Sequence, residues 1–531
     1  MRPFVVLFFL FFFVINDTDA QTSGGDTTTN VEILKGTQRI RLQKLANGTE
    51  VQMLIGNVRL RQGTTLFYCD SCVINNQSKV FEAFGNVHIN DNDSAHVYSK
   101  YLRYLSDTRK AYLKGAVKLT DGKGILTTNE LEYDVASKIG TYTKGGKVVN
   151  KKTVLTSQEG VYYADLHDVY FKKNVTLKDP AHNLKTDSLL YNTETQVARF
   201  IAETVITDSS KRSITTTEGT YDLKAGKAQF TKRTTIKDGA VRIVGNEIAS
   251  DDSTGIVQIL GNGVLVDTAQ GISILANEIF ADKKKAAYLA TRKPLMIIKQ
   301  EKDSIYVTAD TLFSARLSDL YSVIDTANKK LSTKIKKAKP KEDSTDRYFE
   351  AFRNVKVFTD SIQTVSDSLF YSFKDSTFRL FQNPIVWSNG KQISGDTIFL
   401  YTKNKKADRV RVFENGFLIS QVEPNVYNQI KAVRMFGYFK DGVIDSLNAK
   451  GMAESIYFLQ DKDSAYSGIN KTESDAMDVY FLNGELRKVV LRRSVKGTLF
   501  PAHQKSPGEM RLENFRWQDE RRPKTKYELF Q

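Results

Sequence analysis

The sequence predicts an all-β protein, a repetitive antiparallel sheet of about eleven units, each of about 30 residues and two strands. Three observations predict it. Apolar and polar residues alternate in short stretches separated by turn residues, as in "GAVKLTDGKGILTTNELEYD" (115–134). The same pattern recurs along the chain. The 531 residues include 24 Tyr and 31 Phe but only 9 Pro, which favours half-buried strands.

The repeat is defined by two columns of apolar residues. The first column lies near the end of the motif "x-L-x-Y" and consists of Ile74, Tyr104, Tyr133, Tyr163, Tyr191, Tyr221, Ser250, Ala281, Ser314, Tyr371 and Leu400. The second follows in most units, often after a Gly or Asn as in "FGNV" and "GNGV", and consists of Val87, Val117, Val148, Val175, Val205, Val264, Leu295 and Ile385. Each unit is therefore expected to be two strands joined by turn residues such as Asp121 and Gly122.

Alternation within the strands predicts one apolar face throughout the array. Leu131 and Tyr133 share one face of their strand, while Glu130, Glu132 and Asp134 share the other. A sheet that repeats this pattern buries one face and exposes the other to water.

The chain divides into seven predicted segments. They are a signal peptide (1–20), an N-terminal lead-in (21–48), the repeat array (49–315), a Lys-rich insertion (316–347), a continuation of the array (348–420), a C-terminal β sheet (421–500) and a charged tail (501–531). We interpret the insertion as an exposed excursion from a continuing sheet, because the motif resumes in register at "FRNVKVF". A loop that contacts a membrane surface or an anionic partner is the alternative. A distinct terminal sheet is expected because repeat arrays need atypical ends.

The first twenty residues are typical of an export signal. Arg2 precedes an apolar run of about 12 residues, which is too short to span a bilayer, and "TDA" supplies small residues at a cleavage site before Gln21. The sequence therefore predicts a mature chain outside the cytoplasm, in the periplasm, with association at the outer membrane as a further expectation. An uncleaved anchor is the alternative.

No combination of residues predicts catalysis, a metal site or a cofactor. Cys69 and Cys72 are expected on opposite faces of a strand, in a structural role. The five His are scattered. Aspartates precede strands at the same place in several units (Asp187, Asp310, Asp367 and Asp396), which favours a turn role because a catalytic pair should be unique. We expect a protein that is not an enzyme and needs no cofactor.

The repeated residues also carry a family resemblance. The units "EAFGNVHIND" and "KNVTLKDPAHNLKTDSLLYN" resemble the OstA-like domain of the LptA family of periplasmic lipopolysaccharide transport proteins. The resemblance implies an antiparallel folded sheet, open along one side like a bent jelly roll, whose interior carries lipid A acyl chains. It also implies three partners, namely lipopolysaccharide, an inner-membrane exporter and an outer-membrane translocon, and leaves end-to-end self-association open.

On this resemblance, the inner face would bind lipid. The candidates are Val87, Ile89, Tyr104, Val117, Leu119, Leu131, Tyr133, Tyr163, Val175, Leu177, Leu189, Tyr191, Val205, Tyr221, Val264 and Ile279.

The chain carries a positive net charge, which bears on its partners. The net charge is +16, and removal of residues 1–20, which contain Arg2, Asp17 and Asp19, leaves +17, so basic side chains at the rim would attract phosphate groups. Nucleic acid is not an expected partner, because the chain is exported and has no recognition motif.

Two rival functions remain. An exported scaffold or adhesin would show the same repeat, and a β-helix enzyme acting on polysaccharide is the second rival.

Overall fold

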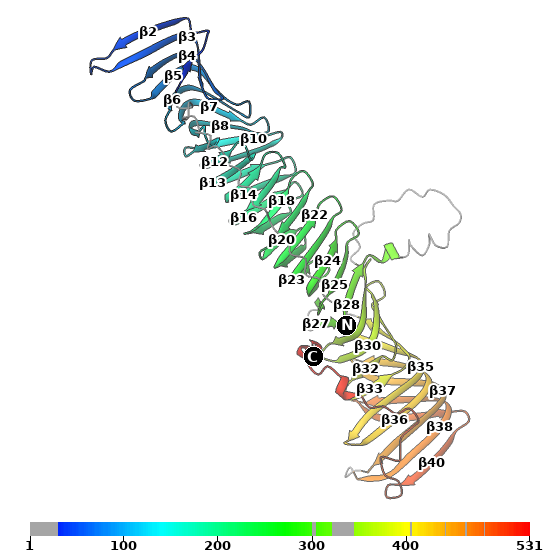
Figure 1. The fold of residues 1–531 in the computed structure, drawn as a ribbon. Coiled ribbons are helices and arrows are strands. Elements are labelled where there is room, and N and C mark those ends of the chain that lie inside the picture. The colour runs from blue at the N-terminus through cyan, green and yellow to red at the C-terminus, as the bar shows by residue number, and fades with distance from the viewer. Residues whose placement is uncertain are drawn as a thin grey trace, which may run out of the picture. The chain divides into compact units, whose positions relative to one another are not determined.

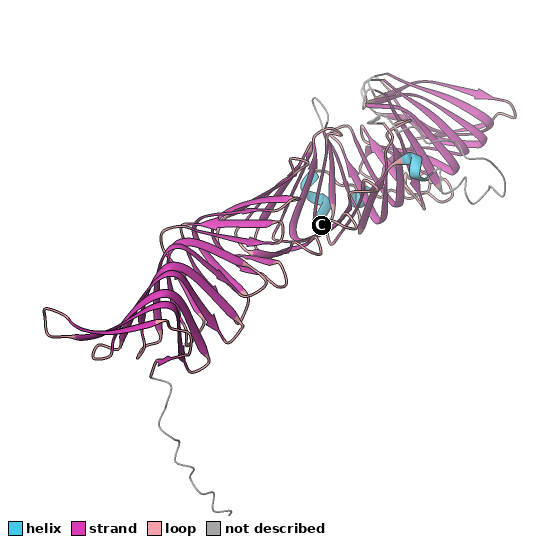
Figure 2. Cartoon of the chain, turned by 90° about the horizontal axis from the view of Figure 1, so that it is seen from above, coloured by secondary structure: helices cyan, strands magenta, loops and turns pink. Residues whose placement is uncertain are grey.

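The computed structural model describes residues 30–299, 304–320, 345–403, 406–440, 442–461, 465–482 and 484–530. The predicted signal peptide and most of the Lys-rich insertion lie outside these residues. The chain divides into two compact units, Met1–Tyr170 and Phe171–Gln531. Strands dominate the described residues, accompanied by short helical turns that include η2 (Asp519–Arg521) and η3 (Lys526–Phe530) (Figure 2). No helix of the described part is long and apolar enough to cross a membrane.

The first unit (Figure 1, blue to cyan) contains the strands β1 to β12, and β13 carries the chain into the second unit. Their bounds are β1 Glu32–Ile33, β2 Arg39–Lys44, β3 Glu50–Gln62, β4 Thr65–Asn75, β5 Val80–Asp91, β6 Ala95–Leu105, β7 Lys110–Thr120, β8 Ile125–Asp134, β9 Ile139–Tyr142, β10 Gly146–Asn150, β11 Thr153–Ser157, β12 Glu159–Tyr163 and β13 Asp168–Lys178.

The second unit (Figure 1, green to red) contains the remaining described strands. Their bounds are β14 His182–Asn192, β15 Val197–Phe200, β16 Thr204–Asp208, β17 Ser213–Thr216, β18 Gly219–Asp222, β19 Lys227–Phe230, β20 Thr234–Asp238, β21 Val241–Gly245, β22 Glu247–Asp251, β23 Ile256–Asp267, β24 Ile272–Asp282, β25 Ala287–Thr291, β26 Leu295–Lys299, β27 Ser304–Thr308, β28 Thr311–Ala315, β29 Tyr348–Phe358, β30 Ile362–Ser372, β31 Thr377–Phe381, β32 Ile385–Ser388, β33 Lys391–Ser394, β34 Thr397–Lys403, β35 Lys406–Glu423, β36 Val426–Lys440, β37 Val443–Gln460, β38 Tyr466–Leu482, β39 Glu485–Arg492 and β40 Lys496–Pro501.

Successive strands pair antiparallel, so the predicted all-β, antiparallel, jelly-roll-like fold is confirmed. Each long strand bends near its middle. In β5 the register shifts between Phe84 and Val87, and Gly85 (φ 70°) and Asn86 (φ 41°) adopt left-handed conformations there. The sequence predicted that the Gly and Asn introduce a strand. They instead form a corner within a continuous strand.

The corner divides each folded sheet into two layers. We call the layer that carries Tyr104 and Tyr133 the tyrosine layer, and the layer that carries Val87 and Val117 the valine layer. The turn at Asp121 and its neighbours joins β7 to β8, as the sequence predicted. In parts of the array the corner interrupts the strand altogether, as between β15 and β16.

The corner at Gly85 gives a testable prediction. A Cβ at Gly85 would collide with the carboxylate of Asp70, which accepts a hydrogen bond from Asn86 Nδ2 at 2.9 Å, whereas a Cβ at Gly122 (φ 82°) would meet open space. Both substitutions to alanine cost about 1 kcal/mol for the left-handed backbone. Gly85→Ala is therefore expected to lower the urea midpoint of unit 1 more than Gly122→Ala. Equal effects would show that the corner has room for a side chain.

Cys69 and Cys72 lie on either side of such a corner in β4, and both are buried on the inner face. The prediction that they occupy opposite faces was wrong, because β4 turns its corner between them. The exposed Asp70 and the half-buried Ser71 interrupt the alternation there, so both cysteines reach the interior. The hydrogen bond with Cys69 and burial together raise the pKa of Cys72.

The sheet continues on both sides of the Lys-rich insertion. β28 and β29 pair antiparallel, and Ala315 lies opposite Tyr348. The described sheet therefore ends β28 at Ala315 and resumes on the neighbouring strand at Tyr348. The four strands after β34 are longer, and β35 and β37 each contain 18 residues, whereas the terminal β39 and β40 contain 8 and 6.

Candidate functional site

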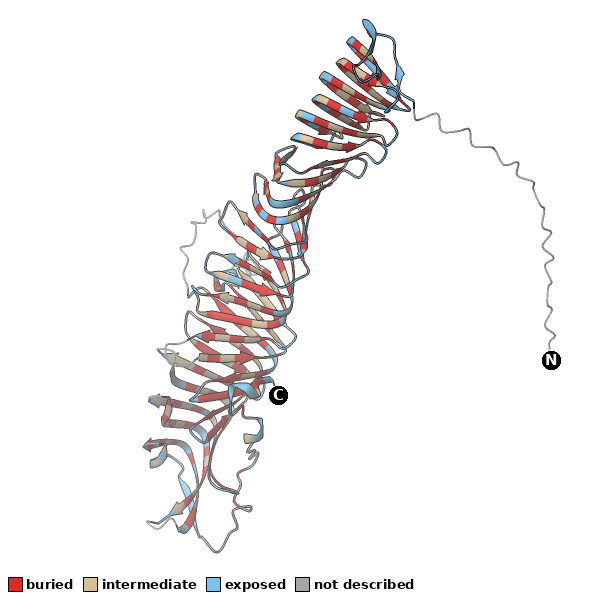
Figure 3. Ribbon diagram, turned by 90° about the vertical axis from the view of Figure 1, so that its left-hand side faces the viewer, coloured by how far each residue is buried: buried red, intermediate tan, exposed pale blue. Residues whose placement is uncertain are grey.

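The inner faces of the two layers form rows of apolar side chains that lie opposite one another on neighbouring strands. Figure 3 shows buried positions alternating with exposed ones along the strands. In unit 1 the row of the valine layer consists of Leu60, Phe67, Ile89, Val97, Leu119, Leu126, Val148 and Leu155, each at most 1 % exposed.

Unit 2 contains two such rows. The row of the valine layer consists of Leu184, Ile206, Ile214, Ile236, Ile243, Leu265, Ile274, Met296, Val307, Val357, Thr364, Val386, Ile393 and Leu418. The row of the tyrosine layer consists of Leu189, Phe200, Gly219, Phe230, Ile248, Ile259, Ile279, Ala290, Leu312, Ala351, Leu369, Leu380, Ile398 and Val412. All are buried and all except Thr364 are apolar, so a largely apolar interior runs along the described strands of the repeat array in this unit.

Most residues that the sequence assigned to the inner face are buried. They are Val87, Ile89, Tyr104, Val117, Leu119, Leu131, Tyr133, Val175, Leu177, Leu189, Tyr191, Tyr221 and Ile279. Their burial places them in the interior and leaves lipid binding as a proposal.

Three assignments to the inner face were wrong. Tyr163 and Val264 are only half-buried, and Val205 is 39 % exposed. The adjacent residues occupy the interior instead, and they are Tyr162, Ile206 and Leu265. Because side chains alternate between faces, an error of one residue in the repeat spacing moves a residue to the other face. Strict alternation within each strand would have found the correct residues, and also Phe200 and Phe230.

Polar contacts join the two layers at the edge opposite the corners, and we call this edge the seam. In unit 1, Tyr104 donates a hydrogen bond to Gln62 Oε1 at 2.5 Å, and Tyr133 donates to Asp91 Oδ2 at 2.9 Å. His167 Nδ1 lies 2.7 Å from Asp121 Oδ2. In each contact, one residue ends a valine-layer strand or lies in the turn that follows it. The other lies near the end of a tyrosine-layer strand or in the turn that follows that strand. The seam therefore closes the interior with polar groups.

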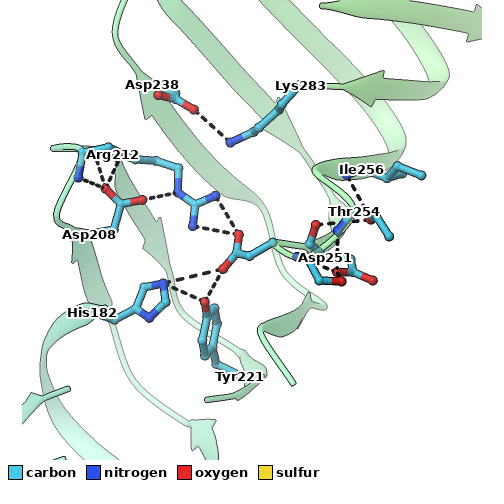
Figure 4. A network of polar contacts seen from close by, with 12 residues as sticks. His182, Asp208, Arg212, Tyr221, Asp238, Asp251, Thr254, Ile256 and Lys283 are labelled. Carbon is cyan, nitrogen blue, oxygen red and sulfur yellow. Dashed lines mark hydrogen bonds and ion pairs between the residues drawn. The ribbon is translucent and has the colours of Figure 1, made fainter. Parts of the chain in front are cut away.

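The most extensive part of the seam lies in unit 2 (Figure 4). Arg212, whose side chain is 9 % exposed, follows β16 and binds Asp208 Oδ2 through Nε at 3.0 Å. Across the seam, Arg212 Nη1 and Nη2 bind Asp252 Oδ1 at 3.0 and 3.1 Å. Tyr221 donates to Asp252 Oδ2 at 2.5 Å and lies 2.8 Å from His182 Nε2. These contacts make Asp252 the centre of a partly buried charged network.

Acid is expected to weaken this part of the seam. Burial alone would raise the pKa of Asp252, but contacts with His182, Tyr221 and Arg212 outweigh it and hold the pKa well below its usual value. A carboxyl with a lowered folded pKa stabilises the fold above its unfolded pKa of about 3.9, and this contribution is lost as the pH falls below that value. When urea unfolding is measured between pH 7 and pH 3, the free energy of unfolding should therefore fall more steeply with acid for the wild type than for Asp252→Asn. Parallel pH profiles would contradict this assignment.

The Tyr133 hydroxyl gives a second prediction for the seam. Tyr133 is fully buried, and burial together with Asp91 raises the pKa of its phenol. Tyr133→Phe keeps the ring and leaves the Asp91 carboxylate with one donor fewer, which should cost about 1 to 3 kcal/mol. Tyr163→Phe, which alters a half-buried ring, is the matched control. Chemical denaturation measures both, and equal values would contradict a sealing role for Tyr133.

Among the described residues, no three His, Cys, Asp or Glu side chains gather in a way that could hold a metal ion. Fold and site define a class of protein, namely a repeat protein whose folded antiparallel sheet encloses an apolar interior behind a polar seam.

Within this class, residues 28–187 match the family model described as OstA-like protein. The match confirms the resemblance over that part of the chain. A solved structure titled as LptH, the LptA homologous periplasmic component of the conserved lipopolysaccharide transport device from Pseudomonas aeruginosa, is 13 % identical. The aligned region covers 32 % of this chain and 80 % of the LptH chain, with a TM-score of 0.14. The search of curated proteins finds no match.

Proposed function

We propose that this chain is a lipopolysaccharide-binding bridge protein of the periplasm, which carries lipid A acyl chains in its apolar interior toward the outer membrane. The single observation that carries the proposal is the pair of inner rows, which keep an apolar character over many successive strands. The OstA-like match over residues 28–187 supports it.

Energetics favour such a carrier. Exposing an acyl chain of about a dozen methylenes to water costs about 0.8 kcal/mol for each, hence on the order of 10 kcal/mol per chain. A lipid with several chains therefore needs a covered path through an aqueous compartment. Copies of one folded unit lengthen the path without changing its cross-section.

The seam supplies the place where head groups would leave the interior. Sugars and phosphates cannot enter an apolar row without losing their hydration. The seam contacts are hydrogen bonds and ion pairs, which a polar head group can replace one at a time. The net charge of +16 favours approach of the anionic lipid.

The partners of such a bridge would be the inner-membrane lipopolysaccharide exporter and the outer-membrane translocon. Self-association through the ends of the array is a further possibility for the bridge. The predicted export signal, residues 1–20, would place the chain in the periplasm.

One observation favours the alternative, an exported scaffold or adhesin. The inner side chains fill the space between the layers without a ligand, since Ile236, Leu265 and Phe230 are at most 1 % exposed. Under the proposed function, the seam must therefore open and the inner side chains must move apart when lipid enters.

Lipid analysis tests the proposed function. The mature protein is purified from the periplasm of cells that make lipopolysaccharide, and the bound lipid is extracted and identified by mass spectrometry. We expect lipid A fatty acids in a fixed ratio to protein. A protein free of lipid, which also fails to bind added lipopolysaccharide, would contradict the proposal and favour the scaffold.

A further inference from the structure

The outer face of unit 2 changes character over β30 to β36. A row across these strands consists of Gln363, Trp387, Gln392, Ile419 and Gln429, which lie opposite one another on neighbouring strands. They alternate with the inner residues, so they face away from the apolar interior. All five are at most 3 % exposed, and the three glutamines are buried amides. Earlier strands of this unit expose the outer face, as at Val205 and Gln229.

The C-terminal segment, residues 509–530, covers this row. Gln429 Nε2 donates to Met510 O, and Gln429 Oε1 accepts from Leu512 N, both at 2.9 Å. Gln392 repeats the arrangement with Arg516 O at 2.7 Å and Gln518 N at 2.9 Å. Each side-chain amide thus forms one hydrogen bond to the backbone carbonyl of one residue and another to the backbone N–H two positions later. A neighbouring β-strand would form the same pattern. The predicted charged tail is in fact part of the folded unit.

Apolar and aromatic contacts hold the first part of the segment. Met510 and Leu512 are buried in a cluster with Phe417, Tyr427 and Ile456. The Tyr427 ring lies 5.2 Å from Phe515 and 5.4 Å from Trp517, measured between ring centroids. The Arg511 guanidinium packs 4.7 Å from the centroid of Tyr427.

Fewer contacts hold the second part. Arg522 Nε donates to Gln363 Oε1 at 2.8 Å, and Leu529 is buried beside β27 and β29. Most other side chains from 520 to 530 are exposed or half-buried. The connection from β40, residues 502–508, is also largely exposed.

We propose that this outer face is a binding site for an extended peptide with alternating apolar side chains, and that the chain's own C-terminal segment occupies it as a releasable strap. Within residues 510–518, Gln392 and Gln429 hydrogen-bond to backbone atoms alone, so these two glutamines accept an extended chain whatever its side chains. The aromatic cluster at Tyr427 supplies the preference for apolar residues.

An unpaired donor indicates that the strap leaves part of the site unused. Trp387 lies between Gln363 and Gln392 in the row and is fully buried. Within the described residues, its indole Nε1 has no hydrogen-bond acceptor. A buried N–H without an acceptor is costly, so a peptide that supplied a carbonyl there would bind more tightly than the strap.

Cleavage and exchange test the proposal in the folded full-length protein. A protease site is inserted between His503 and Gln504, which are both exposed, and the protein is cleaved after folding. We expect the cleaved segment to stay bound in gel filtration. Excess fluorescent peptide of residues 509–530 should then replace it, as a rise in anisotropy shows.

A double variant, Gln392→Leu with Gln429→Leu, should weaken peptide binding about tenfold or more, because four hydrogen bonds to the backbone are lost. Gln229→Leu, on the exposed outer face of β19, should bind like the wild type. The proposal would be overturned if the cleaved segment never exchanged with the peptide, or if the double variant bound the peptide as tightly as the wild type. The assay contains no lipid, so its failure is distinct from failure of the proposed transport function.

Discussion

Replacing Arg212 with alanine is expected to lower the free energy of unfolding of unit 2 by about 3 to 5 kcal/mol, because the change leaves two partly buried carboxylates without their cation. Asp252 keeps the hydrogen bond from Tyr221 but loses both guanidinium contacts. Asp208 loses its contact with Arg212 Nε at the same time. Urea unfolding at pH 7, followed by tryptophan fluorescence and circular dichroism, measures the change.

The matched control is Lys283→Ala, which removes a seam ion pair that is more exposed. Lys283 Nζ lies 2.9 Å from Asp238 Oδ2, and the two side chains are 28 % and 38 % exposed. Pairs of this kind contribute about 0 to 1 kcal/mol. A loss below 1 kcal/mol for Arg212→Ala would mean that the seam opens to water there, which contradicts a closed interior.

The second large effect is expected from a charge in the interior. Leu265 is fully buried in the inner row of the valine layer, between Ile243 and Ile274. Leu265→Asp places a carboxylate among apolar side chains, which costs several kcal/mol and would interrupt the path of an acyl chain. We expect a strong loss of stability and, in the fraction that folds, a loss of bound lipid.

The control stands one position away in the sequence. Val264 is half-buried on the opposite face of β23, so Val264→Asp should change stability by less than about 1 kcal/mol and leave lipid binding intact. Assay of both proteins by thermal unfolding and lipid extraction decides between the two faces. The reverse order of effects would restore the assignment of Val264 to the interior.

Alternation and repetition were enough to predict an all-β repeat with one apolar face, whereas the folded, jelly-roll-like form of the sheet was implied by the resemblance to the OstA-like domain. Leu131 and Tyr133 lie in the interior because a strand has a period of two, and neighbouring units repeat the pattern. The exact inner residue of each unit needed the register. One residue of error in the spacing exchanged Tyr162 for Tyr163 and Leu265 for Val264.

The seam was partly visible in the sequence. Asp91 and Asp121 each lie two positions after the last apolar residue of their strand, where turn residues are expected, so their contacts across the interior gave no separate signal. The Gly and Asn at the corners suggested turns, since left-handed conformations serve both turns and β-bulges. Only the pairing of β5 with its neighbours distinguishes the two.

The strap could not be predicted from local patterns. Gln392 and Gln518 are 126 residues apart, and no periodicity links them. The charges between 509 and 530 indicated a solvated tail, because buried positions such as Met510 and Leu529 are few and widely spaced. Contacts of such sequence separation depend on the tertiary fold.

Site-specific photocrosslinking in living cells tests the central claim most directly. Leu189 faces the interior of unit 2 and is fully buried, whereas Leu190, the next residue of β14, is half-buried on the opposite face. A photoreactive amino acid at 189 should capture lipopolysaccharide, and one at 190 should not; depletion of the inner-membrane exporter should abolish the adduct at 189. The pair Leu131 and Glu132 should repeat this contrast in unit 1. Equal labelling of both faces, or no labelling in cells that export the lipid, would contradict transport through the apolar interior.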